Sequence, residues 1–265
     1  MNTTIARAFL LKLKKTAFKS LSTLLFFALW HAASVTGILD EGIIPGPIGV
    51  IKRLFVDIFA GDLFTKHIIL SFKRAGEGFL ASLIGGASLG FFLKVLPERA
   101  RAALMPVLRM FEKLNPLALF PVFMLFLGIG EGSKVMIIFW VAVWQIAFHT
   151  LAGLLDVDQD LVKAARVMGA GRVGVFWKVC IPAALPDIFN GVKFGAQIAF
   201  IFVVSVEMQS SSAGLGWFIN NAKHIYNLFD LYAGVIVVAL LGVFIGKILA
   251  LVEDRLFSWK ERAIR

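Results

Sequence analysis

The residue types that enzymes use for covalent or metal-assisted chemistry occur in this chain, but without the spacing that such chemistry needs. The four histidines, at positions 31, 67, 149 and 224, are scattered, and there is no H-E-x-x-H segment, so we expect no metal site. Residues 128–134, GIGEGSK, lack the Gly-Lys-Ser/Thr ending of a nucleotide-binding loop. We therefore expect no catalytic residue and no cofactor bound to this chain itself.

Polar side chains within apolar segments are better candidates for a function. Gln145 and His149 lie in one such segment, and Gln197 and Glu207 lie in another. Polar groups are costly to place inside a bilayer and are usually retained for a purpose. We predict that these four residues line or gate a translocation pathway.

Two of these residues also have a structural explanation. His149 either makes an interhelical hydrogen bond or contacts a solute. Glu207 stands at the end of its apolar segment, just before QSSSAGLG. It either gates the outer mouth of a pathway or pairs with Lys134 or Lys223.

The composition requires that the elements carrying these residues cross a membrane. The 265 residues are 59% hydrophobic and 17% charged, with a mean hydropathy of +0.85. Soluble domains are roughly 45–50% apolar and about 25% charged, and a spanning helix needs about 20 apolar residues. We predict an all-α polytopic membrane protein with six transmembrane helices, at residues 20–39, 76–96, 114–129, 134–155, 187–208 and 230–251. The third is short and could extend back through residues 105–111.

The basic residues predict the orientation of these helices. Seventeen lysines and arginines lie in the N-terminal arm, the second-to-third connection, the fourth-to-fifth connection and the tail, whereas five lie in the other connections. Since cytoplasmic segments are enriched in Lys and Arg, both termini should be cytoplasmic. The net charge of +10 is then mainly topological, and we expect no nucleic-acid partner.

This orientation divides the chain into four parts. We expect a basic cytoplasmic arm at residues 1–19, and a first transmembrane helix with an external loop at residues 20–67. That loop should contain a short amphipathic helix near Val50–Phe59. The main transmembrane domain should follow at residues 68–255, and a cytoplasmic tail at 256–265.

Three predicted spans contain glycines four residues apart. Such pairs clear one helix face and allow a neighbouring backbone to approach closely. They are Gly86/Gly90, Gly191/Gly195 and Gly242/Gly246. We take them as an indication of a compact bundle.

The cytoplasmic connection at residues 156–182 has an ordered pattern. Asp158 or Asp160 can cap a helix N-terminus, and Leu161, Ala164, Ala165 and Met168 recur on one helical face. Gly169 then stands where a C-terminal cap requires positive φ.

A second short helix, at residues 172–180, should carry Phe176. Pro182 and Pro186 should set the chain as it enters the fifth span. This order of helix, glycine turn, helix and prolines favours a rigid lever. The alternative is an ordinary amphipathic loop lying on the bilayer surface.

The same residues carry a resemblance to a known family. Lys163-Ala164-Ala165, three residues, Gly169, nine residues and then VCIP resemble the EAA–x3–G–x9–I–x–L–P loop of the permease subunits of ATP-binding-cassette (ABC) importers. In that family the short helix docks on a cytoplasmic ATPase. The resemblance thus implies an ATPase-docking loop that contains Asp160, Leu161, Lys163, Ala164, Ala165, Met168, Gly169, Phe176 and Pro182. One departure is Lys163, where the family usually has Glu; either the partner ATPase has a compensating acidic residue or this position needs no ion pair.

Further segments are similar to the nitrate, sulfonate and taurine branch of these permeases, namely residues 115–134, 182–195 and 206–219. The resemblance implies a homodimer in the inner membrane, in contact with lipid. Its expected partners are a cytoplasmic ATPase, which would hold ATP and Mg²⁺, and a periplasmic or lipid-anchored solute-binding protein. The substrate would be a small anion or organic solute such as nitrate, a sulfonate or taurine.

Two other functions fit the sequence less well. A stand-alone secondary transporter or channel fits less well, because no inverted repeat is visible and the docking loop would have no purpose. An intramembrane enzyme fits least, because the histidines are scattered and the sequence has no H-E-x-x-H segment.

Overall fold

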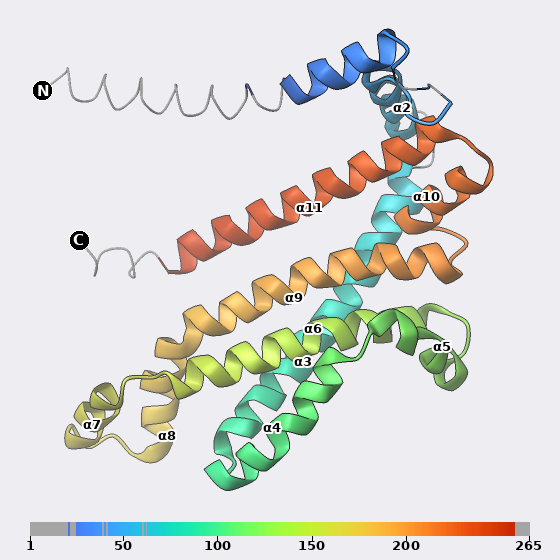
Figure 1. Cartoon of the computed structure of the whole chain (residues 1–265). Coiled ribbons are helices and arrows are strands. Elements are labelled where there is room, and N and C mark those ends of the chain that lie inside the picture. The colour runs from blue at the N-terminus through green and yellow to red at the C-terminus, as the bar shows by residue number, and fades with distance from the viewer. Residues whose placement is uncertain are drawn as a thin grey trace, which may run out of the picture. The chain divides into compact units, whose positions relative to one another are not determined.

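The computed structural model describes Leu21 and residues 25–257, except 39, 41, 60 and 62. Every regular element within these residues is a helix (Figure 1). The expected basic arm and nearly all of the expected cytoplasmic tail lie outside the described residues. The chain divides into two compact units, one from the residues up to 62 with Ile219–Ile236, and the other from Leu63–Phe218 with the residues from Val237 onward.

The first unit contains α2 (Pro47–Phe59), which confirms the amphipathic helix expected near its position. Arg53 of α2 donates to Asp230 with both Nε and Nη2, and Nε also lies 3.3 Å from the Asp57 carboxylate. Burial, above all, raises the pKa of the Asp57 carboxyl, and the charge of Asp230 adds to the rise. Asp230 belongs to the first turn of α11 (Leu228–Leu256), so this ion pair fastens α2 to that turn.

The first predicted span is only partly described. A short apolar helix occupies Leu25–Val35, and several of the neighbouring residues that would lengthen it lie outside the described chain. Whether residues 20–39 cross the membrane therefore stays a prediction.

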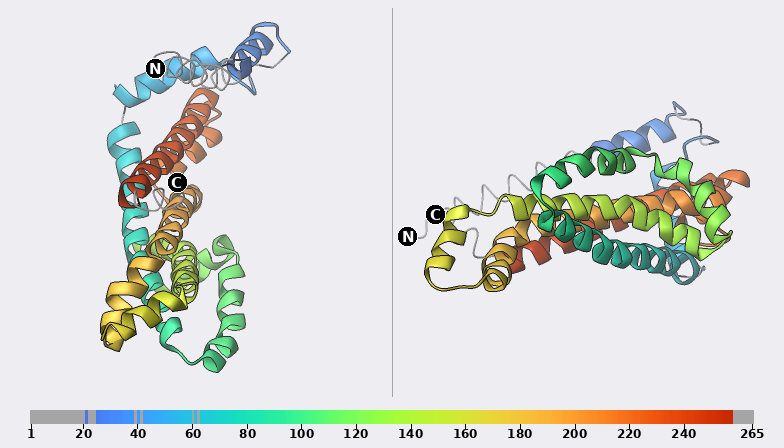
Figure 2. Two further views of the ribbon diagram at one scale, coloured as in Figure 1. Left: turned by 90° about the vertical axis from the view of Figure 1, so that its left-hand side faces the viewer. Right: turned by 90° about the horizontal axis from the view of Figure 1, so that it is seen from below.

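The second unit is built around α6 (Glu131–Leu155), which packs against α3 (Ile69–Val95) on one side and α9 (Ile181–Ser210) on another (Figure 2). Glycine makes both contacts close. A Cβ added at Gly86 of α3 would lie 2.7 Å from the carbonyl oxygen of Val143, and one at Gly191 of α9 would lie 2.6 Å from Cβ of His149. Since real Cβ atoms do not approach so closely, these helices can pack in this way only with glycine at those positions.

The third glycine pair does not make such a contact. A Cβ at Gly242 would meet only Phe200 Cε1 at 4.0 Å, and one at Gly246 only Gln197 Nε2 at 3.8 Å. The nearest atoms belong to side chains rather than to a neighbouring backbone. Gly242 and Gly246 therefore make no close backbone contact with the described residues.

The predicted third span is a bent pair of helices. α4 (Glu98–Lys113) and α5 (Pro116–Leu127) meet at an angle of 91°. Asn115 caps α5 by accepting from the amide of Leu117 at 3.0 Å, and Pro116 occupies the first turn, where its missing N–H costs no hydrogen bond. Residues 105–111 are thus helical, but they do not continue the axis of α5.

The helix that contains the fifth predicted span begins earlier than expected. A π-helical segment, η2 (Phe176–Cys180), joins α8 (Arg172–Val175) directly to α9, so that helix runs without a break from Arg172 to Ser210. Pro182 and Pro186 lie inside this helix rather than between two helices. The π segment widens the turn ahead of Pro182, and such local adjustments allow a helix to accommodate proline.

In all, the described residues contain four helices that are long and apolar enough to cross a membrane, or five if α4 and α5 are counted as one span. They are Leu63–Val95, Glu131–Leu155, Arg172–Ser210 and Leu228–Leu256. The first of these includes α3 and a preceding π-helix, η1 (Leu63–Ile68).

Candidate functional site

The expected docking residues and Glu207 lie at opposite ends of the second unit. α7 (Gln159–Val167) and α8 lie at one end of α6 and α9, and α5 lies at the other (Figure 1). The expected docking residues belong to the first end. Glu207 belongs to the second.

α7 is held to the bundle by its buried side. Val162 and Ala165 pack with Val175 of α8, Leu154 of α6 and Ala184 of α9 in one apolar cluster. Phe176 packs against the same cluster, and its ring meets that of Phe91 edge-on at 6.1 Å. Ala165 and Phe176 are thus anchors of the loop rather than part of its outer surface.

The exposed side of this loop carries several large apolar side chains beside its charged residues. Leu161, Ala164 and Met168, three of the four residues expected to share a face, all point outward. Large apolar side chains that were not among the expected residues extend this surface, namely Val167, Val173 and Trp177. Val167 and Met168 are 89% and 80% exposed, although burial of such apolar side chains away from water is favourable. We call Leu161, Val167, Met168, Val173 and Trp177 the outer face of the loop.

Gly169 forms the turn between the two helices. Its φ is +85°, its amide donates to the carbonyl of Arg166 at 3.0 Å, and the amide of Ala170 donates to the carbonyl of Ala165 at 3.1 Å. These two bonds form a Schellman cap, which places positive φ at the residue after the helix. The predicted positive φ at Gly169 is confirmed. Glycine is favoured here because β-branched residues rarely adopt this backbone conformation.

The charged residues of α7 interact with each other. Asp158 is the N-cap and accepts from the amide of Asp160 at 2.9 Å. Lys163 Nζ lies 2.9 Å from Asp160 Oδ1, and both side chains are largely exposed. An exposed pair of this kind contributes about 0–1 kcal/mol, so the Lys163 charge remains available to a partner.

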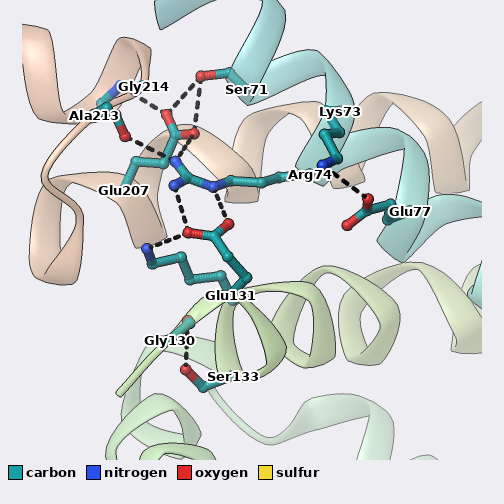
Figure 3. A network of polar contacts seen from close by, with 12 residues as sticks. Ser71, Lys73, Arg74, Glu77, Gly130, Glu131, Ser133, Glu207, Ala213 and Gly214 are labelled. Carbon is teal, nitrogen blue, oxygen red and sulfur yellow. Dashed lines mark hydrogen bonds and ion pairs between the residues drawn. The ribbon is translucent and has the colours of Figure 1, made fainter. Parts of the chain in front are cut away.

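At the other end, Arg74 of α3 is 3% exposed and joins three elements through a network of polar contacts (Figure 3). Its guanidinium is bidentate to Glu131 of α6, with Nη2 at 2.7 Å, and Nη1 donates to Glu207 of α9 and to the carbonyl of Ala213, both at 2.8 Å. Lys134 also contacts Glu131, at 3.1 Å. Arg74, Lys134 and Glu207 are buried, whereas the Glu131 side chain is 57% exposed. The two basic and two acidic side chains balance in charge, which is how the buried charges are tolerated.

Glu207 also organises the segment that follows α9. Ser71 donates to its carboxylate at 2.7 and 2.9 Å, and the amide of Gly216 donates to it at 3.0 Å. Ser71 in turn accepts from the amide of Leu215, at the start of α10 (Leu215–His224). Free amides at a helix N-terminus attract an oxygen acceptor. Glu207 and Ser71 therefore cap α10 from within the bundle.

This network corrects the partners expected for Glu207. Its cation is Arg74 rather than Lys134 or Lys223, because α3 brings Arg74 directly against α9 while Lys134 turns to Glu131. Arg74 was not among the expected residues, because the predicted second span began at residue 76, whereas α3 already begins at Ile69. The sequence did contain a sign of this role, because an arginine at the edge of an apolar segment, as Arg74 is, needs an acidic partner if it is buried.

The other expected pathway residues are not brought together. Gln145 lines a cavity of about 260 Å³ at the α4–α5 bend, shared with Lys113 and Trp144. Gln197 lines a separate cavity of about 210 Å³ between α9 and α11. His149 stacks on the ring of Phe194 of α9, with centroids 5.5 Å apart.

The described residues contain no group of three or more His, Cys, Asp or Glu side chains that could hold a metal ion.

The comparisons identify the chain's relatives. Residues 83–259 match the family described as binding-protein-dependent transport system inner membrane component. The chain is 31% identical to the putative aliphatic sulfonates transport permease SsuC of Bacillus subtilis (strain 168), over 88% of this chain and 84% of that protein.

Two further relatives belong to the expected branch. The taurine transport system permease TauC of Escherichia coli (strain K12) is 26% identical over 91% of this chain and 89% of its own length. The nitrate import permease NrtB of Synechococcus elongatus is 26% identical over 91% and 86%. The resemblance to nitrate, sulfonate and taurine permeases is thus confirmed.

A solved structure shares the fold. A chain in the crystal structure of a bacterial alginate ABC transporter, in complex with an alginate-bound periplasmic protein, superposes with a TM-score of 0.63 over 95% of this chain and 96% of its own. The two sequences are 13% identical, so this likeness concerns the fold alone.

Proposed function

Because the chain belongs to the family of binding-protein-dependent transport system inner membrane components, we propose that two copies of it form the translocation pathway of an ABC importer. A separate cytoplasmic ATPase supplies the energy and holds ATP and Mg²⁺. A solute-binding protein delivers the substrate on the outer side of the inner membrane, and both termini face the cytoplasm.

The observation that carries this proposal is the loop between α6 and α9. Its inner side is anchored in the bundle, and its outer face presents Val167, Met168 and Trp177 uncovered. Apolar side chains that are exposed on a rigid helix–turn–helix suit a protein partner that covers them. The spacing of Lys163, Ala164, Ala165 and Gly169 matches the family's docking motif, and we assign the ATPase to this face.

The substrate proposal rests on the named relatives. One transports aliphatic sulfonates, one transports taurine and one imports nitrate, as their names state. All three substrate classes carry an oxyanion. We therefore propose a small oxyanion or an organic sulfonate as the substrate.

Within the pathway, we propose that Gln145 and His149 face the solute, while Gln197 lies closer to α11. Glu207 acts at the outer mouth through Arg74 rather than by touching the solute, since it is 1% exposed. It sets where α10 begins and so shapes the entrance.

Gly169→Val tests the docking function. A β-branched residue at φ +85° is strained, so we expect the turn to distort and the ATPase to dissociate or to hydrolyse ATP without transport. No apolar span is altered, so insertion into the membrane should be unchanged. The measurements are the ATPase that co-purifies with the permease and the transport rate in vesicles.

Gly171→Val is the matched control. Gly171 lies two residues away, has φ −67°, and a Cβ there meets nothing within 4 Å. It should keep near-normal assembly. Normal ATPase recovery and transport in Gly169→Val would mean that the loop is a passive surface segment and that the docking assignment is wrong.

A further inference from the structure

One face of α2 is apolar and uncovered within the described chain. Ile48, Ile51, Phe55 and Phe59 follow one another at intervals of three or four residues, so they share one side of the helix. They are 51%, 42%, 58% and 80% exposed. The rings of Phe55 and Phe59 stack in parallel with centroids 6.0 Å apart, which makes the surface continuous. We call these four residues the α2 stripe.

The opposite side of α2 is fixed in place. Val50 is fully buried, Arg53 is paired with Asp230, and the ring of Phe229 lies so close to Gly49 that an added Cβ would come within 2.6 Å of it. These contacts prevent α2 from rotating about its axis. The stripe therefore cannot turn inward to become part of the protein core.

The chain keeps α2 close to the membrane. Only residues 60–62 separate Phe59 from Leu63, where the first long spanning helix begins. Four Cα–Cα steps reach at most about 14 Å. Lys52 also borders the stripe, and a lysine in that position can extend its ammonium group to lipid phosphates while its stem covers apolar surface.

We propose that α2 lies in the plane of the membrane interface, with the α2 stripe inserted among the lipids of the outer leaflet. An exposed apolar face bordered by a basic residue, on a helix tethered to a span, has the features of an interfacial helix. The choice of the outer leaflet rests on the topology given under the proposed function. The insertion of the α2 stripe into lipid does not depend on that topology.

Lipid suits this face better than a protein that binds and leaves. The stripe has no hydrogen-bonding side chain, whereas interfaces between separable proteins are about as polar as the rest of the surface. A binding protein that dissociated in each cycle would return two phenylalanines and two isoleucines to water every time. Lipid covers them permanently.

The inserted helix would hold the beginning of α11. Arg53 links α2 to Asp230 in the first turn of α11, and Phe229 packs on Gly49. Because the stripe fixes α2 at the bilayer surface, these contacts fix the depth of that turn as well. The long apolar helix that follows thus starts from an anchored point.

Spin labels can measure the insertion. Cys180 is the single cysteine, so Cys180→Ser gives a background in which one new cysteine can be labelled. We would label Ile51→Cys, Phe55→Cys and Phe59→Cys in the full complex in lipid vesicles. Collisions with oxygen, which concentrates in the bilayer, would be compared with collisions with nickel-EDDA, which stays in water.

The stripe labels should collide several-fold more with oxygen relative to nickel-EDDA than a label at Asp156, an exposed residue outside the long helices. A label at Val50 should be shielded from both reagents, since that residue is buried. Phe59 lies in the last turn of α2 and is 80% exposed, so replacing it should disturb the fold least and its label remains informative even if another variant folds poorly.

Two results would overturn the proposal. Preferential collision with nickel-EDDA at the stripe would place it in water, and shielding from both reagents would place it against a protein, either a second copy or a partner. The side of the membrane is tested separately, by an impermeant maleimide reacting with Lys52→Cys from outside right-side-out vesicles. A failure there would contradict the proposed topology and leave the insertion standing.

Discussion

Among single residues, Arg74 has the most consequential position. It is 3% exposed and bridges Glu131 and Glu207, which lie on two other helices. Removing one partner of a buried ion pair leaves an uncompensated charge and typically costs about 3–5 kcal/mol. We expect Arg74→Gln to lower the thermal unfolding midpoint in detergent markedly and to reduce transport. Glu207→Gln in the same chain should recover part of the loss, because the stranded carboxylate is gone.

Lys73→Gln is the control at this scale. Lys73 is the preceding residue on the same helix, but its side chain is exposed and its pair with Glu77 spans 3.9 Å. Such a surface pair contributes about 0–1 kcal/mol, so the midpoint should barely move. Equal losses in Lys73→Gln and Arg74→Gln would show that the network has no special role.

At the scale of elements, the α3–α6 contact depends on the absence of side chains. A Cβ at Gly90 would lie 2.7 Å from the carbonyl oxygen of Ala147 and 2.6 Å from Cβ of Thr150. Neither atom can move without shifting α6, so Gly90→Ala should separate the helices and lower the unfolding midpoint.

Gly76→Ala, on the same helix, is the control, because a Cβ added at Gly76 meets nothing within 4 Å. It should be neutral or slightly stabilising, because alanine favours helix by roughly 1 kcal/mol over glycine. If both variants unfold alike, close packing of these helices is not what stabilises the unit.

At the scale of the whole molecule, the proposal requires more than one chain. We expect the purified importer to contain two copies of this 29.1 kDa permease and two ATPase subunits. The permease stripped of that subunit should hydrolyse no ATP. Native mass spectrometry gives the stoichiometry, and a phosphate-release assay on the stripped permease tests the second point. A stable single chain that transports its solute without an ATPase would favour the alternative of a stand-alone transporter.

The sequence by itself determined those features that depend on residues close together in the chain. Hydropathy over about 20 residues located the long helices, and the Asp158 cap and the Gly169 turn followed from the backbone preferences of neighbouring residues. The docking motif could be recognised for the same reason, since its spacing lies within one short segment. The glycine pairs indicated a compact bundle, and close helix contacts occur at Gly86, Gly90 and Gly191.

Only the tertiary structure decided which distant residues meet. The contact of Arg74 with Glu207 joins positions 133 residues apart, and nothing in the local sequence chooses Arg74 over Lys134 or Lys223. The 91° bend after α4, the open surroundings of Gly242, and the burial of Ala165 beside the exposed Leu161 likewise depend on what each helix packs against. A local pattern specifies a helix and its caps, whereas the identity of a partner is set by how whole helices fit together.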